Sequence, residues 1–273
     1  MEKRLVVFDS DLSIEAYQFQ GVKQKFPNHF HEFYVIGFIE KGRRFLSCKQ
    51  QEYIVEAGDL LLINPYDNHF CEQLGEETLD YRSIHISPLV MLELTERIIG
   101  LRKRLLFSQN VIPAYTNLTA LKELHSLMVT SADSHRKTEA LDQCLKRILI
   151  EYSDYEGTQA YEYSDVVEQV CSYINKYYAE AIVMEELSEQ FGVNQFTLIR
   201  QFVKDKGVTP HQYLRTVRIS KAQKLLEQGI PPAQAATDSG FSDQSHFSRY
   251  FKHLIGVTPK QYMDIFHQEG LNA

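Results

Sequence analysis

The stretch from Gly240 to Phe251 reads GFSDQSHFSRYF, and a related stretch from Gly192 to Phe202 reads GVNQFTLIRQF. The second copy has one extra residue after its glycine, and from Leu198 and Phe247 onward the two copies keep an offset of 49 residues. The later matches are Arg200/Arg249, Phe202/Phe251, Gly207/Gly256, Pro210/Pro259 and Tyr213/Tyr262. A match of this length predicts that the chain contains a duplicated structural unit.

Each copy has the pattern of a helix-turn-helix. In the first copy, residues 184–191 predict a short helix that ends at Gly192, because glycine tolerates the left-handed backbone of a helix C-terminus. Asn194 can then cap the next helix with its side-chain oxygen. The second copy has the same parts: a helix over 232–239, a turn at Gly240 and a cap at Ser242 or Asp243.

The second helix of each copy separates an inward face from an outward face. Leu198 and Phe202, four residues apart, predict the core side of the first copy, as Phe247 and Phe251 do in the second. The side chains predicted to point outward are Gln195, Phe196, Ile199, Arg200, Gln244, Ser245, Ser248 and Arg249. Arginine can pair with a guanine edge and glutamine with an adenine edge, so these faces predict base contacts.

Phe196 and Ile199 are large apolar side chains on the predicted outward face. In water they would be a liability, whereas the methyl group of a thymine offers an apolar partner. The alternative is that Phe196 belongs to the protein core.

Residues 209–228 connect the two copies and predict one helix, opened by Thr209-Pro210 and closed by Gly229. Its apolar stripe is Tyr213, Leu214, Val217, Ala222, Leu225 and Leu226. Roughly 19 helical residues at ~1.5 Å each span about 28 Å, which is close to the ~34 Å turn of B-DNA. One rigid helix could therefore hold both outward faces in successive major-groove segments on one side of a duplex.

The net charge of −7 argues against a nucleic-acid partner until the charges are mapped along the chain. Residues 162–199 carry one base against seven acids, whereas residues 200–260 carry ten bases against four acids, a local charge of +6. Because the local field steers a polyanion, this distribution permits DNA binding without establishing it.

The first 85 or so residues predict short strands. Residues 32–40 are aromatic and β-branched, residues 81–86 alternate, and Gly58-Asp59 and Asn64-Pro65 mark turns. Many short strands separated by turns predict a small β-barrel or sandwich.

From Pro88 the apolar period becomes helical. Two amphipathic stripes, separated by a polar break at 131–137, consist of Leu118, Leu121, Leu124 and Met128, then Leu141, Leu145, Ile148 and Leu149. They predict a helical hairpin that either forms a dimer surface or packs on the strands. Residues 154–164 are polar and contain a glycine, so they predict a linker.

The composition, 44% hydrophobic and 24% charged, is that of a soluble globular protein. No apolar run approaches the ~20 residues that span a bilayer, and the N-terminus lacks a secretion signal. The four cysteines are dispersed and form no CxxC pair, so we expect reduced thiols in the cytoplasm rather than disulfides or a thiolate metal site. A reactive sensor thiol among them stays open.

Residues of about 165–265 resemble the DNA-binding domain of the AraC/XylS family of bacterial regulators. The resemblance rests on Arg218-Ile219 with Ala222, on Leu225-Leu226, on 240–247, on Phe251-Lys252 and on 256–259. It implies base contacts near Phe196, Ile199, Arg200, Gln244, Ser245, Ser248 and Arg249, and phosphate contacts by Lys204 and Lys252. One departure is Ala235-Ala236-Thr237, where family members often have an Ile-Ala-like pair, so we expect a less apolar helix there.

The N-terminal half resembles the cupin-type sensor domain of many such regulators, through His29-Phe30-His31-Glu32, Gly42, Gly58-Asp59, Asn64-Pro65 and His69. The effector site that this resemblance implies comprises His29, His31, Tyr34 and His69. Histidines at alternate strand positions could bind a divalent metal. Cupin enzymes usually add a glutamate three to five residues after the second histidine, where this chain has Tyr34, Val35 and Ile36. We therefore predict no metal and no cofactor.

These observations predict an α+β protein of two domains, a cupin-like β-barrel with a helical hairpin and an all-α domain of two helix-turn-helix units joined by a long helix. The predicted bounds are 1–87 for the barrel, 88–153 for a helical dimerisation region, 154–164 for the linker and 165–273 for the DNA-binding domain.

The predicted function is transcription regulation through double-stranded DNA, with no catalytic residue and no membrane partner. The resemblance implies a homodimer, activation through RNA polymerase, and a sugar or related metabolite as effector in the barrel. Two alternatives stay open: a metal-dependent cupin enzyme with a DNA-binding appendage, and a constitutive DNA-binding protein whose barrel only dimerises.

Overall fold

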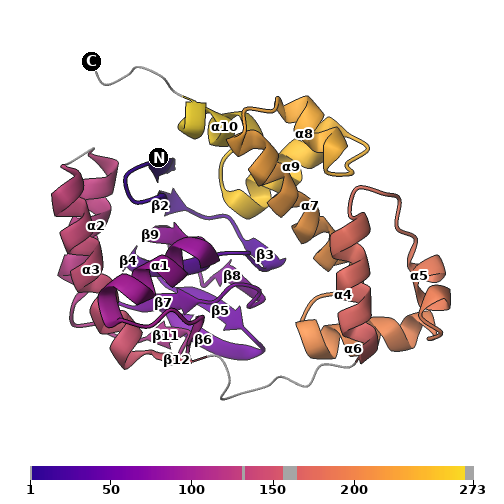
Figure 1. The fold of residues 1–273 in the computed structure, drawn as a ribbon, viewed down its shortest axis with the longest axis horizontal. Helices are drawn as coiled ribbons and strands as arrows, with labels where there is room; N and C mark the ends of the chain where they lie inside the picture. Colours follow the sequence, from indigo (N-terminus) through magenta and orange to yellow (C-terminus); the bar gives the residue numbers. More distant parts are fainter. Residues whose placement is uncertain (1, 131–132, 156–164, 268–273) are drawn as a thin grey trace. The chain divides into compact units, whose positions relative to one another are not determined.

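The computed structural model describes residues 2–130, 133–155 and 165–267 (Figure 1). The chain divides into two compact units, residues 1–25 with 31–160 and residues 26–30 with 161–273. The first unit is rich in β-structure and the second is helical, so the predicted α+β organisation in two domains is confirmed. Of the linker predicted at 154–164, residues 156–164 lie outside the described residues.

The larger sheet of the first unit is antiparallel, with its six strands in the order β1-β2-β9-β4-β7-β11. The aromatic and β-branched residues of β4 are buried on both of its faces. Ile36 of β4 pairs in register with Leu62 of β7 and with Ile84 of β9. The strands are β1 (Lys3–Asp9), β2 (Ile14–Val22), β4 (Tyr34–Lys41), β7 (Leu60–Ile63), β9 (Leu79–Ile86) and β11 (Val111–Ile112).

A smaller sheet, in the order β3-β8-β5-β6, packs against one face of the larger one. Leu46 and Val55 of the smaller sheet share a core with Ile39, Leu61 and Leu79 of the larger sheet. The strands are β3 (Phe26–His29), β5 (Arg44–Cys48), β6 (Gln51–Val55) and β8 (His69–Gln73), with a separate pair formed by β10 (Leu105–Phe107) and β12 (Ser153–Tyr155).

These strands were predicted to form a cupin-like barrel or a sandwich, and the barrel is not closed. Within the described ranges the two sheets stay separate, and β1 and β11 are the outer strands of the larger one. The apolar faces of this sheet are buried by layers, with the smaller sheet on one side and helices on the other. Layered packing buries a sheet without bending it into a closed cylinder.

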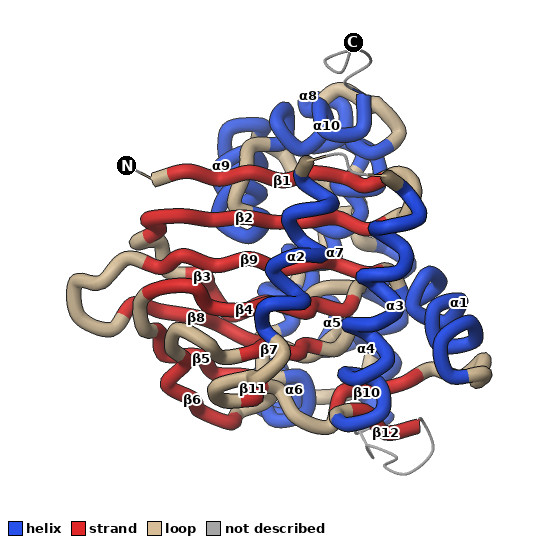
Figure 2. Tube along the Cα trace, turned by 90° about the vertical axis from the view of Figure 1, so that its left-hand side faces the viewer, coloured by secondary structure: helices blue, strands red, loops and turns tan. Residues whose placement is uncertain are grey.

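Helices α2 (Leu118–Val129) and α3 (Ser134–Glu151) lie across the other face of the larger sheet (Figure 2), and α1 (Pro88–Ile99) packs on α3. The helical stripes share one core with alternate strand residues such as Ile36 and Ile84. The stripe residues buried there are Leu121, Leu124, Met128, Leu141, Leu145, Ile148 and Leu149. Of the two uses considered for the hairpin, these side chains serve packing on the strands.

The second unit is helical, and its local sequence sets where each helix ends. Leu198, Phe202 and Tyr213 form its first core, to which Phe30 contributes with ring centroids 5.0 Å from Tyr213. Phe251 packs edge-on against Phe247 and Tyr262 in the second. The helices are α4 (Asp165–Tyr177), α5 (Met184–Gln190), α6 (Gln195–Lys206), α7 (Pro210–Glu227), α8 (Pro232–Asp238), α9 (Gln244–Ile255) and α10 (Pro259–His267).

Candidate nucleic-acid interface and histidine group

Helices α6 and α9 begin and end by the same local chemistry. The Asn194 side chain accepts a hydrogen bond from the backbone N–H of Phe196 at 2.9 Å, and Asp243 accepts one from Ser245 at 2.8 Å. Gly207 and Gly256 close the helices in the left-handed region, at φ of 68° and 95°. The two helices are therefore equivalent elements of a duplicated unit.

The inward and outward faces of α6 and α9 follow the predicted spacing. Leu198 and Phe202 are buried in the first copy of the repeat, as Phe247 and Phe251 are in the second copy. Arg200, Lys204, Gln244, Ser245, Arg249 and Lys252 are exposed, and Gln195, Ile199 and Ser248 are half-buried. Neither arginine is sealed inside the protein, as the prediction of base contacts requires.

Phe196 is the most exposed large apolar side chain of the described residues, at 81%. The alternative of a core position is excluded by this exposure. An aromatic ring in water at the first turn of α6 gives no folding stability, so it is available to an apolar ligand surface such as a thymine methyl group.

The connector α7 has a complete N-terminal capping box. The Thr209 hydroxyl accepts from the backbone N–H of Gln212, and the Gln212 side chain accepts from the backbone N–H of Thr209. The helix has 18 residues, which at ~1.5 Å each give about 27 Å. This length is close to the distance that successive major-groove segments require.

The loop at 178–180 braces α7 and the second helix-turn-helix. Arg218 donates from Nε to the carbonyl of Tyr178 at 2.7 Å and from Nη2 to the carbonyl of Glu180 at 2.8 Å. Gly240 has a φ of +85°, and a Cβ there would lie 2.8 Å from Ala179. Sequence reasoning missed this brace because the residues that meet are about 40 to 60 positions apart.

Several bases of the +6 stretch have partners inside the protein rather than facing outward. The Arg215 guanidinium lies 3.8 Å over the Tyr250 ring, and burial raises the pKa of Tyr250, an effect that Arg215 opposes. Lys206 pairs with Glu168, and Lys260 pairs with Asp264 at 2.8 Å. Fewer basic side chains are therefore available to DNA than the ten counted in residues 200–260.

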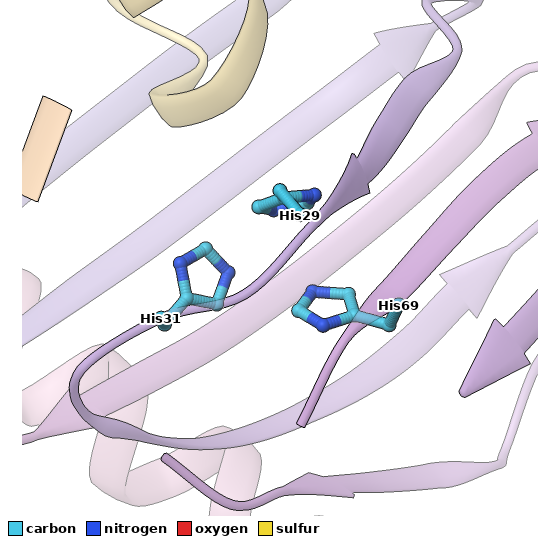
Figure 3. A group of neighbouring side chains, drawn as sticks. All are labelled: His29, His31 and His69. Carbon is cyan, nitrogen blue, oxygen red and sulfur yellow. The ribbon is translucent and has the colours of Figure 1, made fainter. Parts of the chain in front are cut away.

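Three histidines form a group at one end of the smaller sheet: His29 at the end of β3, His31 just after it, and His69 at the start of β8 (Figure 3). One ring nitrogen of each lies within 4.8 Å of the others. The Nδ1 atom of His29 lies 2.6 Å from the carbonyl of Pro27, and that of His69 lies 3.0 Å from the carbonyl of Asp67. These bonds favour the tautomer that keeps the Nε2 lone pair.

Burial keeps imidazoles of this region neutral. It lowers the pKa of His69, with the backbone bond to Asp67 in opposition. It lowers the pKa of His85 on β9 to about 3, with the His69 charge as a smaller cause. Neutral imidazole is the form that accepts a hydrogen bond or binds a metal.

Three imidazoles are a donor set for a transition metal such as Zn²⁺. Bonds of about 2.0–2.1 Å around a tetrahedral ion place ligand atoms about 3.4 Å apart. Separations of up to 4.8 Å require the rings to close in before they hold an ion together. The group as it stands suits hydrogen bonds to a polar ligand.

Tyr34, predicted as a fourth member of this group, is not brought together with the histidines. It faces the helical layer, where its hydroxyl donates to the carbonyl of Leu105 at 2.7 Å. His85 lies beside the histidine group, which the sequence did not predict, and its ring centroid is 5.9 Å from that of His31 and 4.6 Å from that of Phe33. The alternation of residues 81–86 was the available signal, because alternate residues of a strand share one face of the sheet.

In the part of the chain that the structure describes, no helix is both long and apolar enough to cross a membrane.

A duplicated helix-turn-helix with exposed arginines, carried with a separate β-rich domain, defines a DNA-binding transcription regulator. Residues 187–265 match the family described as a helix-turn-helix domain, and residues 11–149 match the AraC-like ligand binding domain. The chain belongs to the AraC family of transcriptional regulators.

Relatives with the same class of function match most of the chain. The chain is 47% identical over 269 residues to the HTH-type transcriptional regulator YbfI of Bacillus subtilis (strain 168), covering 98% of each. It is 27% identical to the HTH-type transcriptional activator RhaS of Salmonella arizonae, covering 86% of each. The fold is similar to apo ToxT from Vibrio cholerae, with a TM-score of 0.56 and 18% identity, covering 93% of this chain and 97% of that one. A crystal structure of ToxT bound to an unsaturated fatty acid has a TM-score of 0.53 and 17% identity, covering 92% and 94%.

Proposed function

We propose that this regulator is a transcription activator that reads DNA with α6 and α9 and responds to a small-molecule effector bound in its N-terminal domain. The observation that carries the DNA part is the pair of equivalent outward faces, 49 residues apart in sequence, at the two ends of α7. The activator role is supported by the relatives named as the activator RhaS.

The proposed base contacts are made by the exposed first two turns of each recognition helix. Arg200 and Arg249 read guanine, Gln195 and Gln244 read adenine, and Phe196 meets a thymine methyl group. Ile199, Ser245 and Ser248 complete the two faces. Lys204 and Lys252, one turn further along, bind phosphates and set the register on the duplex.

The proposed effector site lies at the histidine group. The rings of His31 and His69, with centroids 5.0 Å apart, can donate to or accept from a polar metabolite such as a sugar. His29 joins them through its place in the same group. The homodimer and the contact with RNA polymerase rest on the resemblance to the family, and the action in the cytoplasm rests on the four free, dispersed cysteines.

Genome-wide footprinting with the purified chain tests the DNA part. Bound fragments are expected to share a two-part motif whose centres lie about 10–10.5 base pairs apart, because α7 sets the separation of the two faces. Genes beside the bound sites then indicate the effector class. Fragments without any shared motif would contradict sequence-specific binding.

The histidine group also favours one alternative, a metal-dependent enzyme fused to a DNA-binding domain. Metal analysis of the purified chain and of His31→Ala separates the two. A metal that is present in the wild type and lost in the variant, together with lost turnover, supports the enzyme. A changed DNA response to a metabolite library without bound metal supports the sensor, and operator affinity that no metabolite changes supports constitutive binding.

A further inference from the structure

Arg44, the first residue of β5, is the most buried charged side chain of the described residues, at 1% exposure. Alternation along β5 places it on the same face as Leu46, which packs against Ile39 and Leu61 of the larger sheet. The guanidinium therefore lies in the interior between the two sheets, where arginine is rarely found without a partner.

The partners of Arg44 satisfy only part of its guanidinium. Nη2 donates to the carbonyl of Val22. The Nε and Nη1 atoms are buried and have no hydrogen-bond partner among the described residues. An arginine keeps its charge in a protein, so buried N–H donors without acceptors are unfavourable until an acceptor arrives.

No carboxylate in the described parts of the chain forms an ion pair with Arg44. The ionisable group whose charge acts on Arg44 is the thiol of Cys71 on β8. Burial raises the pKa of this thiol to about 11, and the positive charge of Arg44 opposes that rise. Burial also lowers the pKa of Arg44. Cys71 is protonated at neutral pH and supplies no counter-charge, so the cation lacks an anion.

A phenol and apolar walls complete the surroundings. Tyr81 of β9 lies across β4 at Gly37, where an added Cβ would stand 2.2 Å from its hydroxyl. Burial raises the pKa of Tyr81 to about 12, an effect that a hydrogen bond with the Ser83 side chain opposes, so the hydroxyl stays protonated. Tyr81 and Cys71 both pack on the apolar core that contains Leu46 and Leu79. Apolar walls with a few convergent polar groups are typical of small-molecule sites.

We propose that Arg44 binds the anionic group, a carboxylate or a phosphate, of the small-molecule effector. This deepens the proposed function, on which it rests, by stating the charge of the ligand: a sugar acid, a sugar phosphate or another small organic anion rather than a neutral sugar. Cys48, four residues along β5, pairs in register with His69. The backbone positions of Arg44 and Cys48 thus stand about 13 Å apart along the strand, which places Arg44 and His69 toward two ends of one interior face.

Thermal unfolding of the full chain tests the inference with glucuronate, glucose 6-phosphate and inorganic phosphate, each against glucose. Wild type is compared with Arg44→Met, which keeps the side-chain length without the charge. Arg43→Met is the matched control, because the Arg43 side chain is 57% exposed and pairs only loosely with Glu77, at 3.8 Å. A ligand at ten times its Kd shifts the folding equilibrium about elevenfold.

The expected result is that at least one anion raises the Tm of wild type and Arg43→Met, glucose does not, and Arg44→Met binds that anion at least tenfold more weakly. Without ligand, Arg44→Met should unfold at the same temperature as wild type or a higher one, because it removes an unpaired buried charge. Failure of every anion, equal effects on all three proteins, or a clear loss of Tm in ligand-free Arg44→Met would overturn the inference. That last outcome would show that the fold itself satisfies the guanidinium.

Fluorescence anisotropy on a duplex from the footprinting, with the same three proteins, separates this inference from the proposed function. If all three proteins bind DNA specifically and no anion has an effect, the proposed anion site is contradicted and the proposed regulatory function stands. If the wild type binds no DNA specifically, the proposed regulatory function is contradicted, whatever effect the anions have on the Tm.

Discussion

Arg249 and Lys252 lie three residues apart on α9, both exposed, yet they are assigned different tasks. Arg249→Ala should cost about 1–3 kcal/mol at the cognate site and relax the preference for one base pair, because a bidentate contact to guanine is lost. Lys252→Ala should weaken all sequences alike and reduce the salt slope by about one. Anisotropy on cognate and scrambled duplexes at several salt concentrations measures both.

Lys260→Ala is the control for these two substitutions, since that exposed lysine pairs with Asp264 on α10. It should leave both affinities almost unchanged. Equal losses on cognate and scrambled DNA for Arg249→Ala would contradict base reading.

Phe196 and Phe202 sit in one helix with opposite environments, the first exposed and the second fully buried. Phe202→Ala should lower the free energy of unfolding by about 3–5 kcal/mol, because it empties a packed core position. Phe196→Ala should change it by less than about 0.5 kcal/mol and still weaken DNA binding. Urea unfolding and anisotropy on the same samples measure the two effects. A destabilised Phe196→Ala would show that the ring supports the fold.

His125 on α2 is a buried neutral imidazole, with Nε2 placed 2.9 Å from the carbonyl of Tyr17. Burial lowers its pKa to about 4, whereas in the unfolded chain it titrates near 6.5. Below pH 6.5 the unfolded state therefore binds a proton that the folded state does not. Stability from this group is complete above pH 6.5 and falls as the pH drops toward 4, by about 1.4 kcal/mol per unit.

His125→Gln keeps a donor for the Tyr17 carbonyl and does not titrate. The free energy of unfolding of this variant, from urea curves at pH 7, 5.5 and 4.5, should fall less steeply than that of wild type. His85, with its own pKa lowered to about 3, leaves an acid loss in both proteins. Parallel curves for the two proteins would mean that His125 titrates normally.

At the scale of elements, the two turn glycines of the repeat differ in what surrounds them. Gly240 has a φ of +85° and would place a Cβ 2.8 Å from backbone atoms of Ala179, whereas Gly192 has a φ of +66° and no atom within 4 Å of that position. Gly192→Ala should cost about 1–2 kcal/mol from the left-handed backbone alone. Gly240→Ala should cost about 1–3 kcal/mol more, because the loop at 178–180 must move.

Thermal and urea unfolding of the two glycine variants measure this difference. Because the same loop braces α7 through Arg218, Gly240→Ala should also weaken binding to the two-part site more than to either half alone. Similar costs for the two substitutions would mean that the brace is not tight.

At the scale of the whole molecule, a chain of net charge −7 carries two exposed basic faces. The rigid connector predicts a fixed operator geometry. Inserting five base pairs between the halves of the motif turns the second half to the other side of the duplex, so affinity should fall to that of a single half-site. An insertion of ten base pairs should not restore it, because α7 spans only about 27 Å. Anisotropy on these duplexes is the measurement, and full binding after insertion would indicate a flexible connector.

The sequence predicted the helical unit closely, because its signals are local. Turn glycines, capping residues and apolar spacing act within a few residues, and duplication shows each of them twice. The same reasoning placed Arg200, Arg249 and Phe196 on the outside, which their exposure agrees with.

Contacts between distant segments were decided only by tertiary packing. Whether the strands close into a barrel depends on which strands become neighbours. The face that Tyr34 takes depends on the register of β4, because a shift of one residue moves every side chain of a strand to the opposite face. Arg215 and Arg218 count as surface bases in a linear reading, yet Tyr250 of α9 contacts Arg215 and the loop at 178–180 binds Arg218. Arg44 follows a glycine turn like any surface arginine, and only the packing of the two sheets buries it. Side-chain environment is set by what the fold brings from elsewhere, which no local pattern encodes.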